Sequence, residues 1–180
     1  MPLNNIILIG FMGSGKTSIG KRLAKRLKRD YCDTDQLIVE QAGRSIGKIM
    51  ELQGEKNFRD LESAALESLL GKTNNVLATG GGIILQPKNQ ELLRQLGTVI
   101  WLHASSDILF ERARRNTGRP LLEVEHPRHT FNTLLAERLS IYQSLSDLKI
   151  DTTHLSYTQT IEAIVTALPS QFSQEKLRYV

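Results

Sequence analysis

Short apolar runs alternate along the chain with longer segments in which apolar residues recur at helical spacing. The short runs are typical of buried strands; they are Asn4–Gly10, Tyr31–Asp33, Val76–Thr79, Thr98–His103 and Leu148–Asp151. Because helical segments separate these runs, parallel pairing with helices on both faces of the sheet is expected. The pattern therefore predicts an α/β fold with three αβα layers around a central five-stranded parallel sheet.

The segments between the predicted strands carry helix start and stop signals. Capping serines, an opening proline and terminating glycines mark most of their ends. The predicted helices are Thr17–Leu27, Asp35–Ala42, one starting at Ile46 after Ser45, Glu55–Leu70, one from Pro87 to Gly97, one from Ser105 or Ser106 to about Arg115, Thr130–Leu145 and Thr158–Leu168.

One segment lacks any clear period. Asn116–His129 contains Gly118, Pro120 and Pro127, and a loop of this length inside a compact domain suggests a functional lid. We expect the lid to span about residues 112–129. No internal repeat or linker divides the rest, so residues 1–169 are predicted to form a single domain, followed by a loose polar tail at 170–180.

Composition adds a charge argument. The 180 residues are 40% hydrophobic and 23% charged, and 23 Lys and Arg against 19 Asp and Glu give a net charge of +4. A basic balance suggests anionic partners: nucleic acid, a membrane surface, or small phosphates and carboxylates. Six basic residues fall on the first predicted helix and directly after its end, where a solvated outer face is the simplest interpretation; they are Lys21, Arg22, Lys25, Arg26, Lys28 and Arg29.

The location of the protein is predicted from simple signals. Cys32 is the single cysteine, so no intramolecular disulfide can form and a reducing compartment is favoured. The N-terminal sequence lacks the features of a signal peptide, and no segment has the roughly 18 apolar residues of a membrane span. We expect a cytoplasmic protein without a membrane partner.

A phosphate-binding motif follows the first predicted strand. Gly10–Thr17 reads GFMGSGKT and fits G-x-x-x-x-G-K-[ST], in which glycines let backbone N–H groups surround phosphate oxygens. The helix that follows directs its positive end at the anion. Lys16 can reach the β- and γ-phosphates and the Thr17 hydroxyl can bind magnesium. ATP contacts are therefore expected along Gly13, Ser14, Gly15, Lys16, Thr17 and Ser18.

Acidic residues narrow the class of nucleotide-binding protein. No N-K-x-D segment specifies guanine, and no long apolar strand ends in the single aspartate of a motor ATPase. Asp33 and Asp35 follow the second predicted strand, and in extended chain residues i and i+2 point the same way. One carboxylate could then support magnesium while the other orients an acceptor hydroxyl, although aspartates are also common in solvated turns.

Six motifs in order give this sequence a family resemblance. They are GFMGSGKTSIG at Gly10–Gly20, DTD at Asp33–Asp35, GEKNFRDLE at Gly54–Glu62, GGG at Gly80–Gly82, RPLL at Arg119–Leu122 and ERLSIY at Glu137–Tyr142. From about Asn4 to Leu168 the chain resembles the shikimate kinases, a family with the P-loop NTPase fold. The resemblance implies ATP- and magnesium-dependent transfer of a phosphoryl group to the 3-hydroxyl of shikimate, in one in-line step on the route to chorismate.

The resemblance also implies roles for individual residues. Lys16 and Arg119 would stabilise the transferring phosphoryl group, with Arg119 reaching it from the lid. Asp35 would hold the shikimate hydroxyls and orient the proton of the attacking one. The remaining implied contacts are Thr17 to magnesium, Asp33 to magnesium through water, Arg59 and Arg138 to the substrate carboxylate, Gly81 through its backbone N–H to substrate, and Arg112 to adenine. The 151–155 segment, DTTHL, lacks the arginine that family members often place there.

Other interpretations remain open at this stage. Arg59 could simply pair with Glu55 or Glu62 along one helix face, and Arg138 could be a solvated helix residue. Another kinase of the same class could act on gluconate or a nucleoside instead of shikimate. A nucleic-acid-binding ATPase would draw only on the basic charge. We expect no nucleic-acid partner, and the family resemblance implies a monomer.

Overall fold

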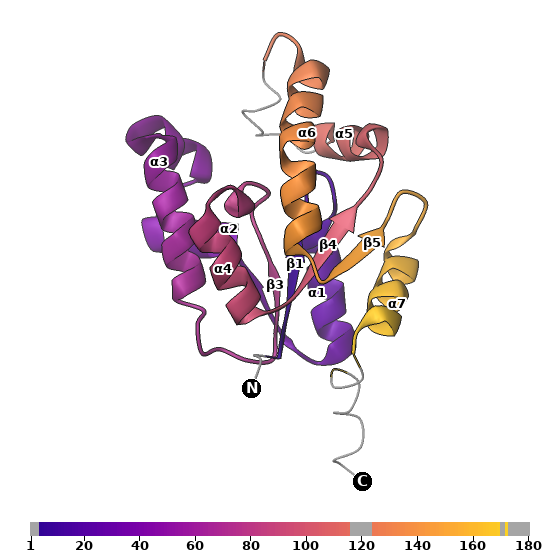
Figure 1. Cartoon of the computed structure of the whole chain (residues 1–180). Coiled ribbons are helices and arrows are strands. Elements are labelled where there is room, and N and C mark those ends of the chain that lie inside the picture. The colour runs from indigo at the N-terminus through magenta and orange to yellow at the C-terminus, as the bar shows by residue number, and fades with distance from the viewer. Residues whose placement is uncertain (1–3, 116–123, 170–171, 173–180) are drawn as a thin grey trace.

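The computed structural model describes residues 4–115, 124–169 and 172. Within them, five parallel strands form one sheet in the order β2-β3-β1-β4-β5 (Figure 1). The strands are β1 (Asn5–Ile9), β2 (Asp30–Asp33), β3 (Asn75–Ala78), β4 (Gly97–His103) and β5 (Leu148–Asp151). In the central strand, Ile7 is in register with Leu77 on one side and with Val99 on the other. The predicted five-stranded parallel sheet is confirmed.

Helices connect the strands and cover both faces of the sheet. They are α1 (Lys16–Leu27), α2 (Thr34–Ala42), α3 (Ile46–Glu67), the short 3-10 helix η1 (Ile83–Leu85), α4 (Pro87–Leu96), α5 (Ser106–Arg114), α6 (Pro127–Leu145) and α7 (Tyr157–Ala167). Helices α1 and α7 lie together against one face, as Figure 1 shows. The opposite face carries α3 to α6. The three-layer αβα prediction is therefore confirmed.

Strand alternation divides the core into two layers. In β1, Ile6 and Leu8 pack with α1 and α7, whereas Ile7 and Ile9 pack with α3 to α6. All four side chains are fully buried, as expected of a central strand in a sheet covered on both faces. Because β1, β2 and β3 are parallel, their carboxyl ends lie at the same end of the sheet, and the loops that follow them start there.

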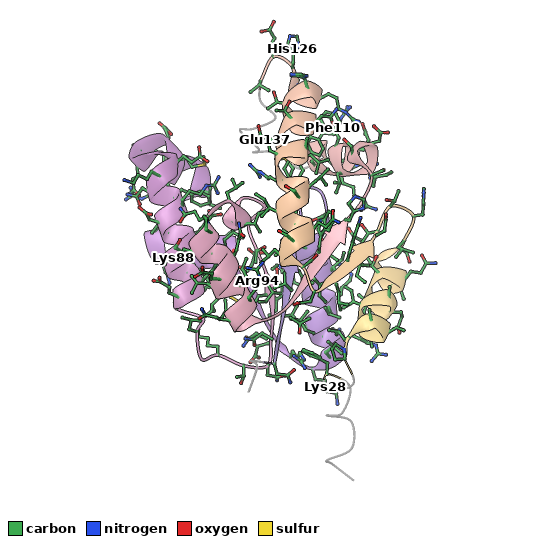
Figure 2. All side chains as sticks on the ribbon, viewed as in Figure 1. Lys28, Lys88, Arg94, Phe110, His126 and Glu137 are labelled. Atoms are coloured by element: carbon green, nitrogen blue, oxygen red, sulfur yellow. The ribbon has the colours of Figure 1, made fainter. Side chains whose placement is uncertain are left out.

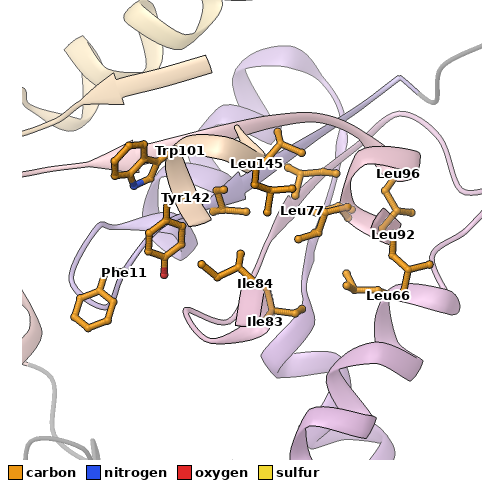
Figure 3. Close-up of a cluster of buried hydrophobic side chains, with 14 of the residues drawn as sticks. Phe11, Leu66, Leu77, Ile83, Ile84, Leu92, Leu96, Trp101, Tyr142 and Leu145 are labelled. Atoms are coloured by element: carbon orange, nitrogen blue, oxygen red, sulfur yellow. The ribbon is translucent and has the colours of Figure 1, made fainter. Parts of the chain in front are cut away.

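Aromatic side chains fill the end of the core nearest those loops. Figure 3 places Phe11, Trp101 and Tyr142 together, far from Leu66 and Leu96 at the other end of the same cluster. The Trp101 and Tyr142 rings are stacked with centroids 5.8 Å apart. This packing fixes Tyr142, whose hydroxyl reaches beyond the apolar cluster.

Gly54 divides α3 in the way the sequence predicts. The pattern predicts one helix from Ile46 and another over Glu55–Leu70, and Gly54 between them has φ 80° and ψ 166° inside an otherwise helical segment. This conformation favours glycine. The second part ends at Glu67 rather than Leu70.

The predicted lid overlaps two helices. Residues 112–114 belong to α5, and α6 begins at Pro127 rather than at Thr130. Proline suits the first helical position because its N–H would have no partner there. The Arg128 guanidinium also pairs with Asp107 of α5 and lies 4.8 Å from the Phe110 ring, so the first turn of α6 is packed. Residues 116–123 of the predicted lid, Arg119 among them, lie outside the described residues.

Phe172 departs from the loose tail predicted after Pro169. Its side chain is buried against the α1–α7 layer, 5.1 Å from the Arg29 guanidinium, because an aromatic side chain gains free energy when it leaves water. The rest of the predicted tail, 170–171 and 173–180, lies outside the described residues.

The basic face predicted on the first helix is largely solvated. Five of its six residues are exposed, including Lys28 at the helix end (Figure 2). Arg29 is the exception: it is buried and donates hydrogen bonds to Asn4. Among the described residues, no helix, α1 included, is long and apolar enough to cross a membrane.

Candidate active site

The loop between β1 and α1 has the geometry of a phosphate cradle. Gly13 and Gly15 have φ angles of 84° and 87°, in the left-handed region that L side chains rarely adopt. A Cβ on Gly13 would also collide with the backbone carbonyl of Leu109 in α5. Gly15 precedes α1 and offers no side-chain cap, so the first N–H groups of the helix stay available to an anion.

A cleft of about 950 Å³ opens over this loop. Its walls come from the cradle, the segment after β2, the end of α5 and the segment after β5. Predicted site residues on its lining are Gly13, Ser14, Gly15, Lys16, Thr17, Ser18, Asp33, Asp35 and Arg112. The structure thus brings the predicted nucleotide residues and both aspartates to one cleft.

Lys16 lies folded over the cradle. Its Nζ donates to the Gly10 carbonyl at 2.7 Å and lies 3.3 Å from the Phe11 carbonyl. Both acceptors are neutral backbone oxygens, and a phosphate would be a stronger, charged acceptor for the same ammonium. The Lys16 ammonium is therefore placed at the mouth of the cradle, where phosphate oxygens would compete for it.

Two hydroxyls and a backbone N–H converge on the Asp33 carboxylate. Thr17 Oγ1 and Tyr31 Oη each donate to Oδ2 at 3.0 Å, and the Asp35 N–H donates to Oδ1 at 3.1 Å. Asp33 caps α2, which begins at Thr34. Asp35 therefore faces the cleft from the first turn of a helix. The prediction that Asp33 and Asp35 share a cleft is correct, but its premise, that both lie in extended chain, is wrong.

The oxygens of this cluster suit magnesium. Mg²⁺ is commonly held by one or two carboxylates together with phosphates of the substrate. A hydroxyl and a carboxylate, Thr17 and Asp33, lie beside the phosphate cradle and within hydrogen-bond distance of each other. The donor set therefore fits a magnesium ion bound with a nucleotide.

The glycine triplet after β3 joins the acidic and basic residues. A Cβ on Gly80 would come within 2.5 Å of Asp35 Oδ1, and a Cβ on Gly82 within 2.5 Å of an Arg59 nitrogen. The Gly80 N–H also donates to the Thr34 hydroxyl at 3.1 Å. A side chain at Gly80 or Gly82 would therefore have to displace the tip of Asp35 or of Arg59. At Gly81 a Cβ would make only ordinary contacts, at 3.5 Å or more.

Arg59 is held by two glutamates. It pairs with Glu55 at 2.8 Å and with Glu62 at 2.7 Å, so the ion pairs considered from the sequence both form. Glu55 is largely exposed, whereas the Glu62 side chain is 1% exposed. Burial raises the pKa of Glu62 to about 7, against the opposing effect of Arg59 and with a further increase from Asp35.

Arg138 lies buried beside the triplet, so it is not a solvated helix residue. It is 6% exposed, its Nη1 donates to the Gly81 carbonyl at 3.3 Å, and its guanidinium lies 5.3 Å from the Phe11 ring. The Tyr142 hydroxyl donates to the same carbonyl at 2.6 Å. Arg138 Nε is buried and has no hydrogen-bond partner among the described residues. A guanidinium fixed beside the triplet would form charge-assisted hydrogen bonds with an anion that binds there.

Arg112 reaches the cleft from the other side. Its guanidinium donates to the hydroxyl and the carbonyl of Thr152, at 3.2 and 3.0 Å. Thr152 is buried just after β5, so Arg112 is fixed at the wall of the cleft opposite the aspartates. Its predicted contact with adenine stays a prediction, as does every role of Arg119.

Four further residues complete the site and were missed from the sequence. Thr34, Glu62 and Tyr142 hold the glycine triplet or its arginines, and Tyr31 holds Asp33. Only Glu62 could have been identified from the sequence, because it lies three residues after Arg59 on the same helix face, a spacing that favours an ion pair. The spacing indicated the ion pair but not the burial.

Comparison with known sequences identifies one family. The sequence model described as shikimate kinase matches residues 12–169. A shikimate kinase of Legionella pneumophila is 42% identical over 165 residues, covering 92% of this chain and 94% of its own. A shikimate kinase of Thermodesulfovibrio yellowstonii is 40% identical over 163 residues, covering 91% and 94%.

A solved structure extends the likeness to three dimensions. Shikimate kinase from Acinetobacter baumannii, in complex with shikimate, matches with a TM-score of 0.87 and 36% identity, covering 98% of this chain and 96% of its own. The family match spans most of the chain, and the fold and cleft described above are consistent with it. The chain belongs to the shikimate kinase family.

Proposed function

We propose that the protein transfers the γ-phosphoryl group of ATP to the 3-hydroxyl of shikimate. The observation that carries the proposal is the meeting of two arginines with a nucleotide cradle: Arg59 and Arg138 contact the same glycine triplet, which also contacts Asp35. A small acid with ring hydroxyls needs a cation for its carboxylate and an acceptor for its hydroxyl protons, and this site offers both.

Binding of the acid begins with its carboxylate. Arg138 is buried beside Gly81, and a carboxylate that meets its guanidinium would gain charge-assisted hydrogen bonds. Arg59 adds a second guanidinium, held by Glu62. The two arginines orient the acid so that its hydroxyls face Asp35 and the cradle, which supplies the proximity needed for transfer.

Transfer follows from the positions of Lys16 and Asp35. The phosphate oxygens of ATP bind the N–H groups of the cradle and of the start of α1. The Lys16 ammonium stabilises the negative charge of the phosphoryl group during transfer. Asp35 accepts the proton of the attacking hydroxyl as the oxygen–phosphorus bond forms and the bond to ADP breaks. Arg119 is proposed to reach the phosphates from the lid. Magnesium, when held by Thr17 and through water by Asp33, would neutralise phosphate charge.

The experiment is an acceptor screen with a coupled assay for ADP. Purified protein with ATP and magnesium should release ADP rapidly with shikimate, and at the ATP-only rate with gluconate or a nucleoside. Equal rates with and without shikimate would refute the proposal.

Binding to DNA or RNA that falls steeply with salt, with stimulated ATP hydrolysis, would instead support a nucleic-acid-dependent ATPase. Sedimentation would test the proposed monomer.

A further inference from the structure

Tyr31 is a half-buried side chain beside Asp33, and the mechanism above gives it no role. It lies in β2, two residues before Asp33, and its ring packs against α1 at Gly20. A Cβ on Gly20 would come within 2.8 Å of Tyr31 Cε2, so the close packing of the ring depends on that glycine. The Lys21 ammonium lies 5.8 Å from the ring centroid. The ring is thus fixed by contacts that do not involve its hydroxyl.

The Tyr31 hydroxyl hydrogen-bonds the Asp33 carboxylate and also interacts with the Thr17 side chain. Tyr31 Oη donates to Asp33 Oδ2 at 3.0 Å, the same oxygen that accepts from Thr17 Oγ1. The other carboxylate oxygen accepts from the Asp35 N–H. Three donors from three elements, α1, β2 and α2, therefore fix both ends of the carboxylate. Of the three donors, the Thr17 hydroxyl has a second role in the proposed reaction, as a ligand of magnesium.

We propose that Tyr31 is a positioning residue for Asp33, holding its carboxylate in the orientation that supports magnesium. The proposal rests on the assignment of Thr17 and Asp33 to magnesium in the proposed function. Thr17 Oγ1 must share its lone pairs with the metal, whereas the Tyr31 hydroxyl has no such task. A phenylalanine at this position would keep the ring packing and leave Oδ2 with one donor fewer.

The test measures nucleotide binding rather than turnover. ADP affinity is determined for the wild type and for Tyr31→Phe, each with and without magnesium and always without shikimate. Losing a hydrogen bond to a charged group weakens that interaction by about 10- to 100-fold, and only part of this loss reaches the metal because Tyr31 acts through Asp33. We expect the gain in ADP affinity on adding magnesium to fall by about three- to tenfold in Tyr31→Phe, with metal-free ADP affinity unchanged.

Two further variants separate positioning from a general structural effect. Tyr142→Phe removes a buried hydroxyl that bonds Gly81 instead of Asp33, and it should keep the wild-type response to magnesium. In an Asp33→Asn background, adding Tyr31→Phe should change the magnesium response little, because the residue through which Tyr31 acts is already altered.

Four outcomes would overturn the proposal. They are an unchanged magnesium response in Tyr31→Phe, an equal loss of metal-free ADP affinity, an additive effect on top of Asp33→Asn, and a wild type whose ADP affinity ignores magnesium. None of these decides whether shikimate is phosphorylated, because shikimate is absent from the experiment. A failed acceptor screen, in turn, would leave these binding measurements interpretable.

Discussion

Replacing Glu62 by glutamine should remove a pH dependence of folding stability that the wild-type protein carries between about pH 5 and pH 8. The Glu62 carboxyl is buried, and its pKa rises from the ordinary 4.5 to about 7 even though Arg59 donates to it at 2.7 Å. Desolvation therefore outweighs the attraction of the guanidinium, and Asp35 adds to the increase. The folded protein binds this proton more tightly than the unfolded chain does.

The sign and size of the effect follow from linkage. Because the folded pKa lies above the unfolded one, the stability associated with this proton is fully present below about pH 4.5 and is lost as the pH rises through about 7. Each pKa unit corresponds to about 1.4 kcal/mol. The wild type should therefore lose about 2 to 3 kcal/mol from this group between about pH 5 and pH 8.

Denaturant unfolding across this pH range measures the effect as a difference between variants. Glu62→Gln should lack this loss of stability, since glutamine does not ionise. Glu55→Gln is the matched control: Glu55 pairs with the same Arg59 guanidinium but is 63% exposed, so this variant should keep the wild-type pH dependence. Asp35→Asn should move the transition to lower pH, because the Asp35 charge raises the pKa of Glu62. Parallel stability curves for the wild type and Glu62→Gln would refute the reasoning.

Further predictions concern substrate, turnover and the fold. Arg59→Ala should raise the shikimate KM by about 10- to 100-fold, the range expected when hydrogen bonds to a charged group are lost; an unaltered KM would count against the carboxylate contact. The wild-type shikimate KM should rise as the pH passes about 7, because ionised Glu62 offsets the charge of Arg59, and Glu62→Gln should flatten this profile. Asp35→Asn should lower kcat by about 100-fold or more with ATP binding retained, and an unchanged kcat would exclude it as the proton acceptor. Asn5→Ala should cost about 1 to 3 kcal/mol in unfolding free energy, because its buried amide donates to two backbone carbonyls and accepts from a backbone N–H; a smaller loss would show that the freed groups find other partners.

The fold was largely predictable because strands and helices leave periodic traces in the sequence. The five apolar runs are interrupted by helices, and parallel pairing then follows from connectivity. Local errors arose where a residue suits two roles. Pro127 suits both a loop and the first turn of a helix. In the structure it begins α6, whose first turn is joined to α5 by the ion pair between Arg128 and Asp107.

The candidate site was predictable in proportion to how local its chemistry is. The cradle is contiguous in sequence, so its motif indicates its geometry directly. Thr34, Glu62 and Tyr142 act through contacts with a glycine triplet that lies 18 or more residues away from each of them. No sequence pattern marks such contacts, because only tertiary packing brings each residue to the triplet.

The central claim is most directly tested by identifying the phosphorylated product. ATP, magnesium and shikimate incubated with the protein should give ADP and a phosphate ester in equal amounts, with the phosphate located by NMR on the 3-hydroxyl of shikimate. Lys16→Met should give neither at a comparable rate. ADP released without a matching amount of phosphorylated shikimate, or a phosphate on another hydroxyl, would contradict the account.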